Sequence, residues 1–118
     1  MQTLTLSDLE QFYGTERYYE HRLGRFNYTD GVRFLADKAA CYWLLDIVAS
    51  VQRMPKIKAE SFIVWNLQRH PDTTRATVKA DDGNGNLLYQ QEIEYTDFPL
   101  DSIKLYMADG VLMLPSEY

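Results

Sequence analysis

The residue types best suited to chemistry gather in residues 15–30, a polar and aromatic stretch with carboxylates, tyrosines and a histidine. A titratable imidazole beside phenolic donors and carboxylates is typical of a small-molecule or catalytic pocket. The alternative is a tyrosine-rich connector whose rings cover the core. The candidate pocket comprises Glu16, Tyr18, Tyr19, His21, Asp30 and, further along the chain, Asp46.

Asp46 belongs to this set because of its helical phase. It follows Leu35 by eleven residues and Ala39 by seven, which at about 100° per residue leaves it about 20° from each, on an apolar helix face. A carboxylate there must reach solvent or find a hydrogen-bonding partner. A partner among Tyr18, Tyr19, His21 or Arg22 would create one site. The alternative is a structural aspartate that ties the connector to the helix.

Other common chemistries lack support in the sequence. A calcium loop starting at Asp82 would have Leu87 at its required glycine and Ile93 at its required glutamate. Two histidines and the lone Cys41 form no zinc spacing, and no serine has a nucleophile motif. We therefore expect neither a metal nor a cofactor, and the sequence favours a protein without enzymatic activity.

The acidity of the chain is concentrated in its second half. The net charge is −5, and residues 60–118 hold four Lys/Arg against ten Asp/Glu. This disfavours nucleic acid as a partner, although arginines of the first half (Arg17, Arg22, Arg25 and Arg33) leave a local basic patch open. An acidic surface suits a protein partner. Its candidate residues are Glu92, Glu94 and Asp97.

Helices are expected in the first half. Ser7 and Glu10 fit a capping box, and Thr15 would cap a short turn through residues 16–21. The main helix is predicted over residues 31–52, capped by Thr29 or Asp30 and stopped at Met54-Pro55.

Strands are expected in the second half, because apolar side chains alternate with polar ones there. Ile63, Trp65 and Leu67 form the inner face of one strand. Turns at residues 81–86 and 108–110 separate later strands. We predict a single α+β domain over residues 1–118, with one long helix and short N-terminal helices packed on a four- to five-stranded antiparallel meander. An exposed final strand at residues 111–114 would permit a homodimer.

Cys41 lies in the most apolar stretch, which indicates a buried thiol in a reducing compartment. The N-terminus lacks a signal-peptide pattern, and the apolar stretch is shorter than a membrane span. We therefore expect a cytoplasmic protein without a membrane partner.

Residues 12–16, 18–19, 21, 28–32 and 39–46 together resemble an uncharacterised bacterial domain family, found in genomes and mobile elements. The resemblance implies a bacterial or phage source, and it joins the N-terminal polar segment and the main helix into one unit. The leading hypothesis is a small non-enzymatic protein that binds another protein through an acidic and aromatic surface. The alternative is a small-molecule-binding or catalytic domain that uses the candidate pocket.

Overall fold

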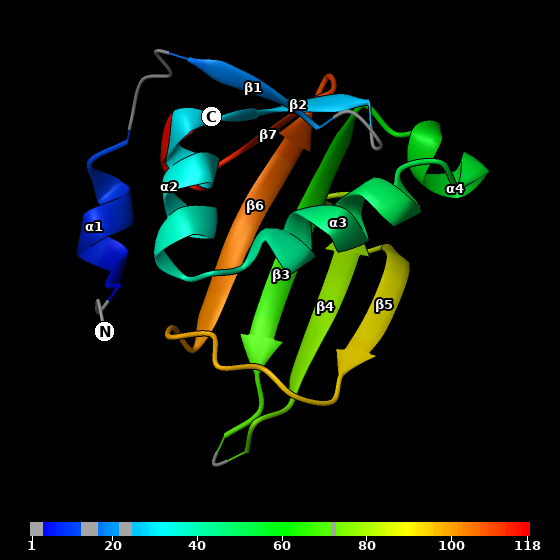
Figure 1. Cartoon of the computed structure of the whole chain (residues 1–118). Coiled ribbons are helices and arrows are strands. Elements are labelled where there is room, and N and C mark those ends of the chain that lie inside the picture. The colour runs from blue at the N-terminus through cyan, green and yellow to red at the C-terminus, as the bar shows by residue number, and fades with distance from the viewer. Residues whose placement is uncertain (1–3, 13–16, 22–24, 72) are drawn as a thin grey trace.

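The computed structural model describes residues 4–12, 17–21, 25–71 and 73–118. In this part of the chain seven strands form one sheet in the order β1-β2-β7-β6-β3-β4-β5 (Figure 1). The strands are β1 (Tyr18–His21), β2 (Phe26–Thr29), β3 (Phe62–Arg69), β4 (Ala76–Asp81), β5 (Leu87–Ile93), β6 (Ser102–Ala108) and β7 (Val111–Met113). The helices are α1 (Leu6–Glu10), α2 (Asp30–Lys38), α3 (Tyr42–Val51), α4 (Pro55–Lys58) and the 3₁₀ turn η1 (Pro115–Glu117).

The predicted four- to five-stranded antiparallel meander is wrong, since the sheet is mixed. β2 runs parallel to β7, with Asn27 opposite Val111 and Tyr28 opposite Leu112. This pairing brings the N-terminal strands into the sheet of the second half. β7 also pairs with β6, so it is an interior strand. The expected free final strand therefore cannot pair with a second copy.

The strands of the second half follow a Greek key path. β3, β4 and β5 are consecutive antiparallel neighbours, and residues 94–101 then return the chain so that β6 pairs with the other side of β3. This order is the Greek key arrangement. Phe98 in the return connection is only 1% exposed, so it anchors the connection to the core. The sequence shows the strands and turns but not this long return.

The helical turn predicted over residues 16–21 is also wrong, because residues 18–21 form β1. Tyr19 and His21 are partly buried while Tyr18 and Glu20 are exposed, an alternation typical of a strand. Aromatic residues favour strands, and Phe26 of β2 pairs opposite His21. The predicted Thr15 cap lies outside the described residues.

The predicted long helix is two helices, α2 and α3. Thr29 caps α2, as predicted, by accepting a hydrogen bond from the Val32 amide at 3.2 Å. α2 then ends in a left-handed turn: Ala40 has φ +51°, and the Cys41 amide donates to the Ala36 carbonyl at 3.0 Å. These features define a Schellman motif. The turn sends α3 in a new direction across the same face of the sheet (Figure 1).

Smaller helix features differ less from the prediction. Thr5, rather than Ser7, caps α1, and Asp8 completes the capping box. Near the predicted stop, α3 ends at Val51 and Pro55 begins α4. None of the described helices is both long and apolar enough to cross a membrane.

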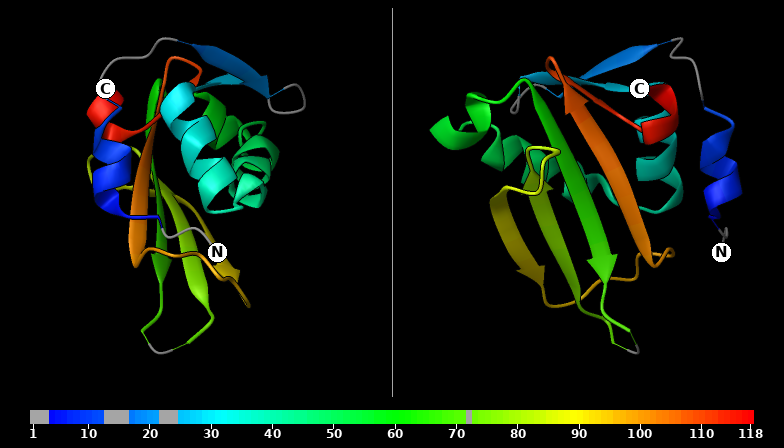
Figure 2. Two further views of the ribbon diagram at one scale, coloured as in Figure 1. Left: turned by 60° about the vertical axis from the view of Figure 1, so that its left-hand side comes forward. Right: turned by 180° about the vertical axis from the view of Figure 1, so that it is seen from behind.

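The core lies between one face of the sheet and helices α2 and α3. Ile63, Trp65 and Leu67 point into it, as predicted, and each is 1% exposed. From behind, β6, β3, β4 and β5 are seen with no helix across them (Figure 2). We call this side the uncovered face. Phe62 and Tyr106 meet on it, with ring centroids 5.2 Å apart.

Candidate functional site

The clearest link between the N-terminal stretch and the helices is a hydrogen bond between His21 and Asp46. The His21 Nε2 atom lies 3.1 Å from Asp46 Oδ1, and the imidazole stacks on Phe26 with 5.1 Å between ring centroids. The His21 side chain is 14% exposed and that of Asp46 is 73% exposed. His21 is thus one of the partners expected for Asp46, and the bond ties β1 to α3.

The exposure of Asp46 corrects the helical-phase prediction. Counting from Leu35 and Ala39 assumes one continuous helix, whereas the turn at Ala40 separates these residues from α3. Because of this turn, the angular position of a residue in α3 cannot be counted from residues of α2. Asp46 therefore faces solvent beside the β1–β2 hairpin instead of the apolar core. A pair with one exposed partner contributes about 0–1 kcal/mol to stability.

A second polar cluster joins β1, α2 and α3 on the same side. The Arg33 guanidinium lies 4.4 Å from the centre of the Tyr19 ring, and Arg33 Nε is 3.8 Å from Asp37 Oδ2. The Tyr42 hydroxyl donates to Asp37 at 2.6 Å. Desolvation and then Asp37 raise the pKa of Tyr42 to about 12. At neutral pH Tyr42 is therefore a hydrogen-bond donor rather than a base.

The structure assembles only part of the candidate pocket. Tyr19, His21 and Asp46 share the helix side of the sheet. Tyr18 alternates to the opposite side and is exposed. Asp30 accepts a hydrogen bond from the Gly31 amide at the start of α2, so it acts locally. Glu16 lies outside the described residues.

The predicted acidic surface falls at the β5 side of the sheet. Glu92 lies in β5, and its two carboxylate oxygens accept from the Thr77 hydroxyl at 3.1 and 3.0 Å. His70 Nε2 is 3.4 Å from Glu92 Oε2. The Thr77 hydroxyl and then His70 lower the pKa of Glu92 below its ordinary value. Glu94 and Asp97 are exposed in the connection after β5. We call Glu92, Glu94 and Asp97 the acidic edge.

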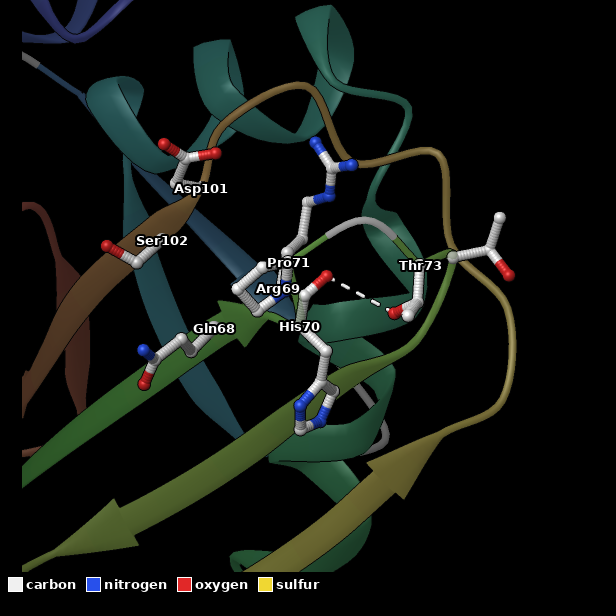
Figure 3. A pocket seen from close by; sticks show the side chains of 8 residues that line it. Gln68, Arg69, His70, Pro71, Thr73, Asp101 and Ser102 are labelled. Carbon is white, nitrogen blue, oxygen red and sulfur yellow. Dashed lines mark hydrogen bonds between the residues drawn. The ribbon is translucent and has the colours of Figure 1, made fainter.

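Two neighbouring hollows open around the end of β3, and Glu92 of the acidic edge lines the first of them. The first, about 310 Å³, lies on the uncovered face between side chains of β3, β4 and β5. The second, about 730 Å³, lies where the β3–β4 turn meets the start of β6 (Figure 3). Arg69 and His70 point to opposite sides there, and the Thr73 hydroxyl donates to the His70 carbonyl at 3.2 Å. Residues lining the first hollow include Asn66, Gln68, His70, Thr77, Lys79, Gln90 and Glu92.

Of this polar group the sequence predicts only Glu92 as a site residue. No motif in the sequence marks His70, Thr77, Lys79 or Gln90 as site residues. Most of these residues share one feature that the sequence shows: they are polar positions that alternate with apolar positions along a strand. Lys79 pairs with Gln90, and Thr77 pairs with Glu92, so the residues gather once the strand register is known. The alternation was visible in the sequence, but the pairing that aligns the strands was not.

The described residues offer no clear metal site. Within ranges 4–12, 17–21, 25–71 and 73–118, no three His, Cys, Asp or Glu side chains come together in a group that could hold an ion.

Fold and site together define a small α+β domain with a mixed sheet, one uncovered face and an acidic edge strand. Residues 3–118 match the model of a family described as "Family of unknown function (DUF6876)". The chain belongs to this family, which confirms the resemblance to an uncharacterised domain family. No significant match is found among curated proteins or among solved structures.

Proposed function

We propose that this protein is a non-enzymatic binding module that recognises a basic surface on another protein through its acidic edge. The observation that carries the proposal is the position of β5, the last strand in the sheet order. Glu92 lies in this strand, and the exposed residues Glu94 and Asp97 follow it. Carboxylates at a sheet margin attract a basic partner and orient its approach.

Exposed apolar side chains at both ends of β5 support the proposal. Leu87, at the start of β5, is 50% exposed, and Tyr95, just after its end, is 71% exposed. Further from Glu92, near the start of β3 on the uncovered face, Tyr118 packs against Phe62 and Tyr106 at 5.3 and 5.4 Å between ring centroids. Aromatic and apolar anchors within a charged rim are typical of protein interfaces.

Affinity capture with charge-reversed variants tests the function. The tagged protein is incubated with lysate of its source organism, and retained proteins and nucleic acids are both identified. Wild type is compared with Glu94→Lys/Asp97→Lys. Because these exposed carboxylates supply the attraction, we expect a stoichiometric protein to be retained by wild type and lost with the variant.

The matched control is Glu10→Lys/Glu60→Lys, which changes the net charge equally at two exposed positions away from β5. It should retain the same protein. Retention by all three proteins, or loss by the control as well, would show that the acidic edge does not select the partner. Recovery of nucleic acid alone would replace the proposal with a nucleic-acid role.

A second candidate function is favoured by the 3.1 Å contact between His21 and Asp46. With Tyr19 and Arg33 close by, these residues offer a cation, a phenol and a titratable imidazole to a small anionic or polar ligand. A thermal-shift screen of small molecules tests it: a ligand should raise the Tm of wild type but not of Asp46→Asn. An equal shift in both proteins would exclude this pair.

The biological setting is part of the same proposal. We place the protein in the cytoplasm of a bacterium, encoded in a genome or a mobile element. The lone buried Cys41 fits a reducing compartment, and the family resemblance supports the source. Fractionation of the source organism, with detection of the native protein by antibody, tests the location.

A further inference from the structure

β5 is an edge strand long enough to accept another strand. In the described part of the chain it pairs only with β4, and it forms the outer margin of the sheet in both Figure 1 and Figure 2. Its seven residues span about 23 Å at roughly 3.3 Å per residue. Successive backbone groups of a strand alternate in direction, so one set of N–H and C=O groups points away from β4.

The usual protections of an edge strand are few in β5. Natural edges are blunted by charged side chains, above all lysine, by proline, by bulges or by a covering element, and Glu92 is the one charged residue of β5. The sequence Leu-Leu-Tyr-Gln-Gln-Glu-Ile contains neither lysine nor proline. The one irregularity in its pairing lies between Ala80 and Asp81, at the beginning of the strand. From Tyr89 to Ile93 the register with β4 is regular, which leaves this segment suited to strand addition.

The side chains of β5 define what an added strand would meet. Gln90 and Glu92 face the uncovered side, where they line the 310 Å³ hollow. Tyr89 and Ile93 face the other side and pack against the core while partly exposed. The side chains of an added strand also alternate between the two faces of the sheet. On the uncovered face they would lie beside Gln90 and Glu92, and on the other face beside Tyr89 and Ile93.

We propose that β5 accepts an extended segment of a basic partner protein as an additional strand. Apolar residues of this segment lie beside Tyr89 and Ile93, and lysines or arginines lie beside Gln90 and Glu92. Main-chain hydrogen bonds supply affinity and the alternate side chains supply selectivity. The inference rests on the proposed function and specifies how the acidic edge engages its partner.

Charge favours this occupant over a second copy of the chain. Self-pairing along β5 would bring two acidic edges together, in a protein whose net charge is −5. Repulsion between two copies of the same negatively charged protein disfavours this association. A Lys- or Arg-bearing strand instead neutralises Glu92 and Glu94.

The probe is a blocked eight-residue peptide of alternating valine and lysine, and the control peptide alternates valine and glutamate. Amide hydrogen exchange of the full chain is followed by NMR. With the lysine peptide, outward amides within residues 87–93 should exchange about tenfold more slowly, because each gains a hydrogen-bond partner. Equal protection by both peptides, or protection confined to another element, would overturn the inference.

Proline variants test the backbone contribution. Since adjacent N–H groups point in opposite directions, one of Gln90→Pro and Gln91→Pro removes an outward donor and leaves the pairing with β4 intact. Circular dichroism identifies the variant that stays folded. Its affinity for the lysine peptide should fall by up to about tenfold, the upper end of the loss expected for one hydrogen bond. Unchanged affinity would contradict strand addition. If both variants unfold, the hydrogen-exchange experiment with the two peptides is the test of strand addition.

Failure of the inference can be separated from failure of the proposed function. If Glu94→Lys/Asp97→Lys loses the captured protein while the folded proline variant keeps it, the acidic edge binds its partner without strand addition. If neither variant loses it, both proposals are wrong. A dimer of the wild type in sedimentation that the proline variant abolishes would identify the occupant as a second copy and overturn the inference.

Discussion

Gly31 is a residue whose small size the fold requires. It lies in α2, where a Cβ atom would stand 2.6 Å from Glu117 Oε1 and 2.8 Å from Leu114 Cδ1. Glu117 is held in place because Oε1 accepts from the Thr29 hydroxyl at 2.6 Å and from the Leu114 amide at 3.0 Å. The C-terminal turn η1 is thereby fastened to the beginning of α2. The pairing of residues so distant in sequence could not be predicted from the sequence.

We expect Gly31→Ala to destabilise the protein by about 1–3 kcal/mol, the usual cost of overpacking. The sign of the change in the free energy of unfolding is informative, because replacing glycine by alanine inside a helix otherwise stabilises a protein by up to about 1 kcal/mol. Denaturant unfolding monitored by circular dichroism measures the difference. A neutral or more stable variant would show that Glu117 and Leu114 move aside at little cost.

Cys41 gives a prediction about alkaline pH. Burial raises the pKa of its thiol to about 12, so the folded state keeps a proton that the unfolded state loses at lower pH. Tyr42 has a raised pKa of about 12 as well. Stability should therefore fall as the pH rises from about 9 towards 12. Unfolding free energies across this range should fall less steeply for Cys41→Ala; an identical slope would contradict the assignment.

At the residue scale the sequence predicted burial better than contacts. Cys41 is buried and Thr29 caps α2, as expected, because both follow from local composition and chain direction. The His21–Asp46 bond was expected only as one of four pairings, and the Glu92–Thr77–His70 group was not expected. Such contacts depend on strand register, which local sequence does not define.

At the scale of elements, the turn between α2 and α3 is the feature that local propensity hides. Alanine is a strong helix former, yet Ala40 has φ +51°, a left-handed conformation that costs an L-residue about 1–2 kcal/mol. Tertiary packing of the two helices on the sheet outweighs this cost. The prediction of a single helix over residues 31–52 was wrong here because neither glycine nor proline marks the turn in the sequence.

Ala40→Gly should stabilise the protein by about 1 kcal/mol, since glycine adopts positive φ without a Cβ penalty. The matched control is Ala59→Gly, at an exposed alanine with φ −73°, where glycine gains nothing and should be neutral or destabilising. Both free energies come from denaturant unfolding. Destabilisation by Ala40→Gly would mean that the left-handed turn is not populated in solution.

In the β1–β2 hairpin, local residue types predict a helical turn where the structure has strands. The polar stretch before α2 carries helix-capping residue types, but its aromatic residues alternate and find partners in a sheet. The strand conformation is stabilised by the antiparallel pairing of β1 with β2 and by the parallel pairing of β2 with β7. The inner strand faces of the second half were predicted correctly because their two-residue periodicity is local.

At the scale of the whole molecule, β7 connects the two ends of the chain within one sheet. It pairs with β2 on one side and with β6 on the other, so the N-terminal hairpin depends on the C-terminal strand. We expect far-UV and near-UV circular dichroism to report one coincident unfolding transition, as a single domain requires. Two separated transitions would divide residues 1–118 into independent units.

We infer that β5 and the acidic edge together form the binding surface of the protein. The most direct measurement is the amide hydrogen exchange of the full chain with and without the protein retained in affinity capture. Slower exchange centred on residues 87–93, and lost with Glu94→Lys/Asp97→Lys, is the predicted result. Protection centred on β1 and α3, or unchanged by the charge reversal, would contradict the claim and direct attention to His21 and Asp46.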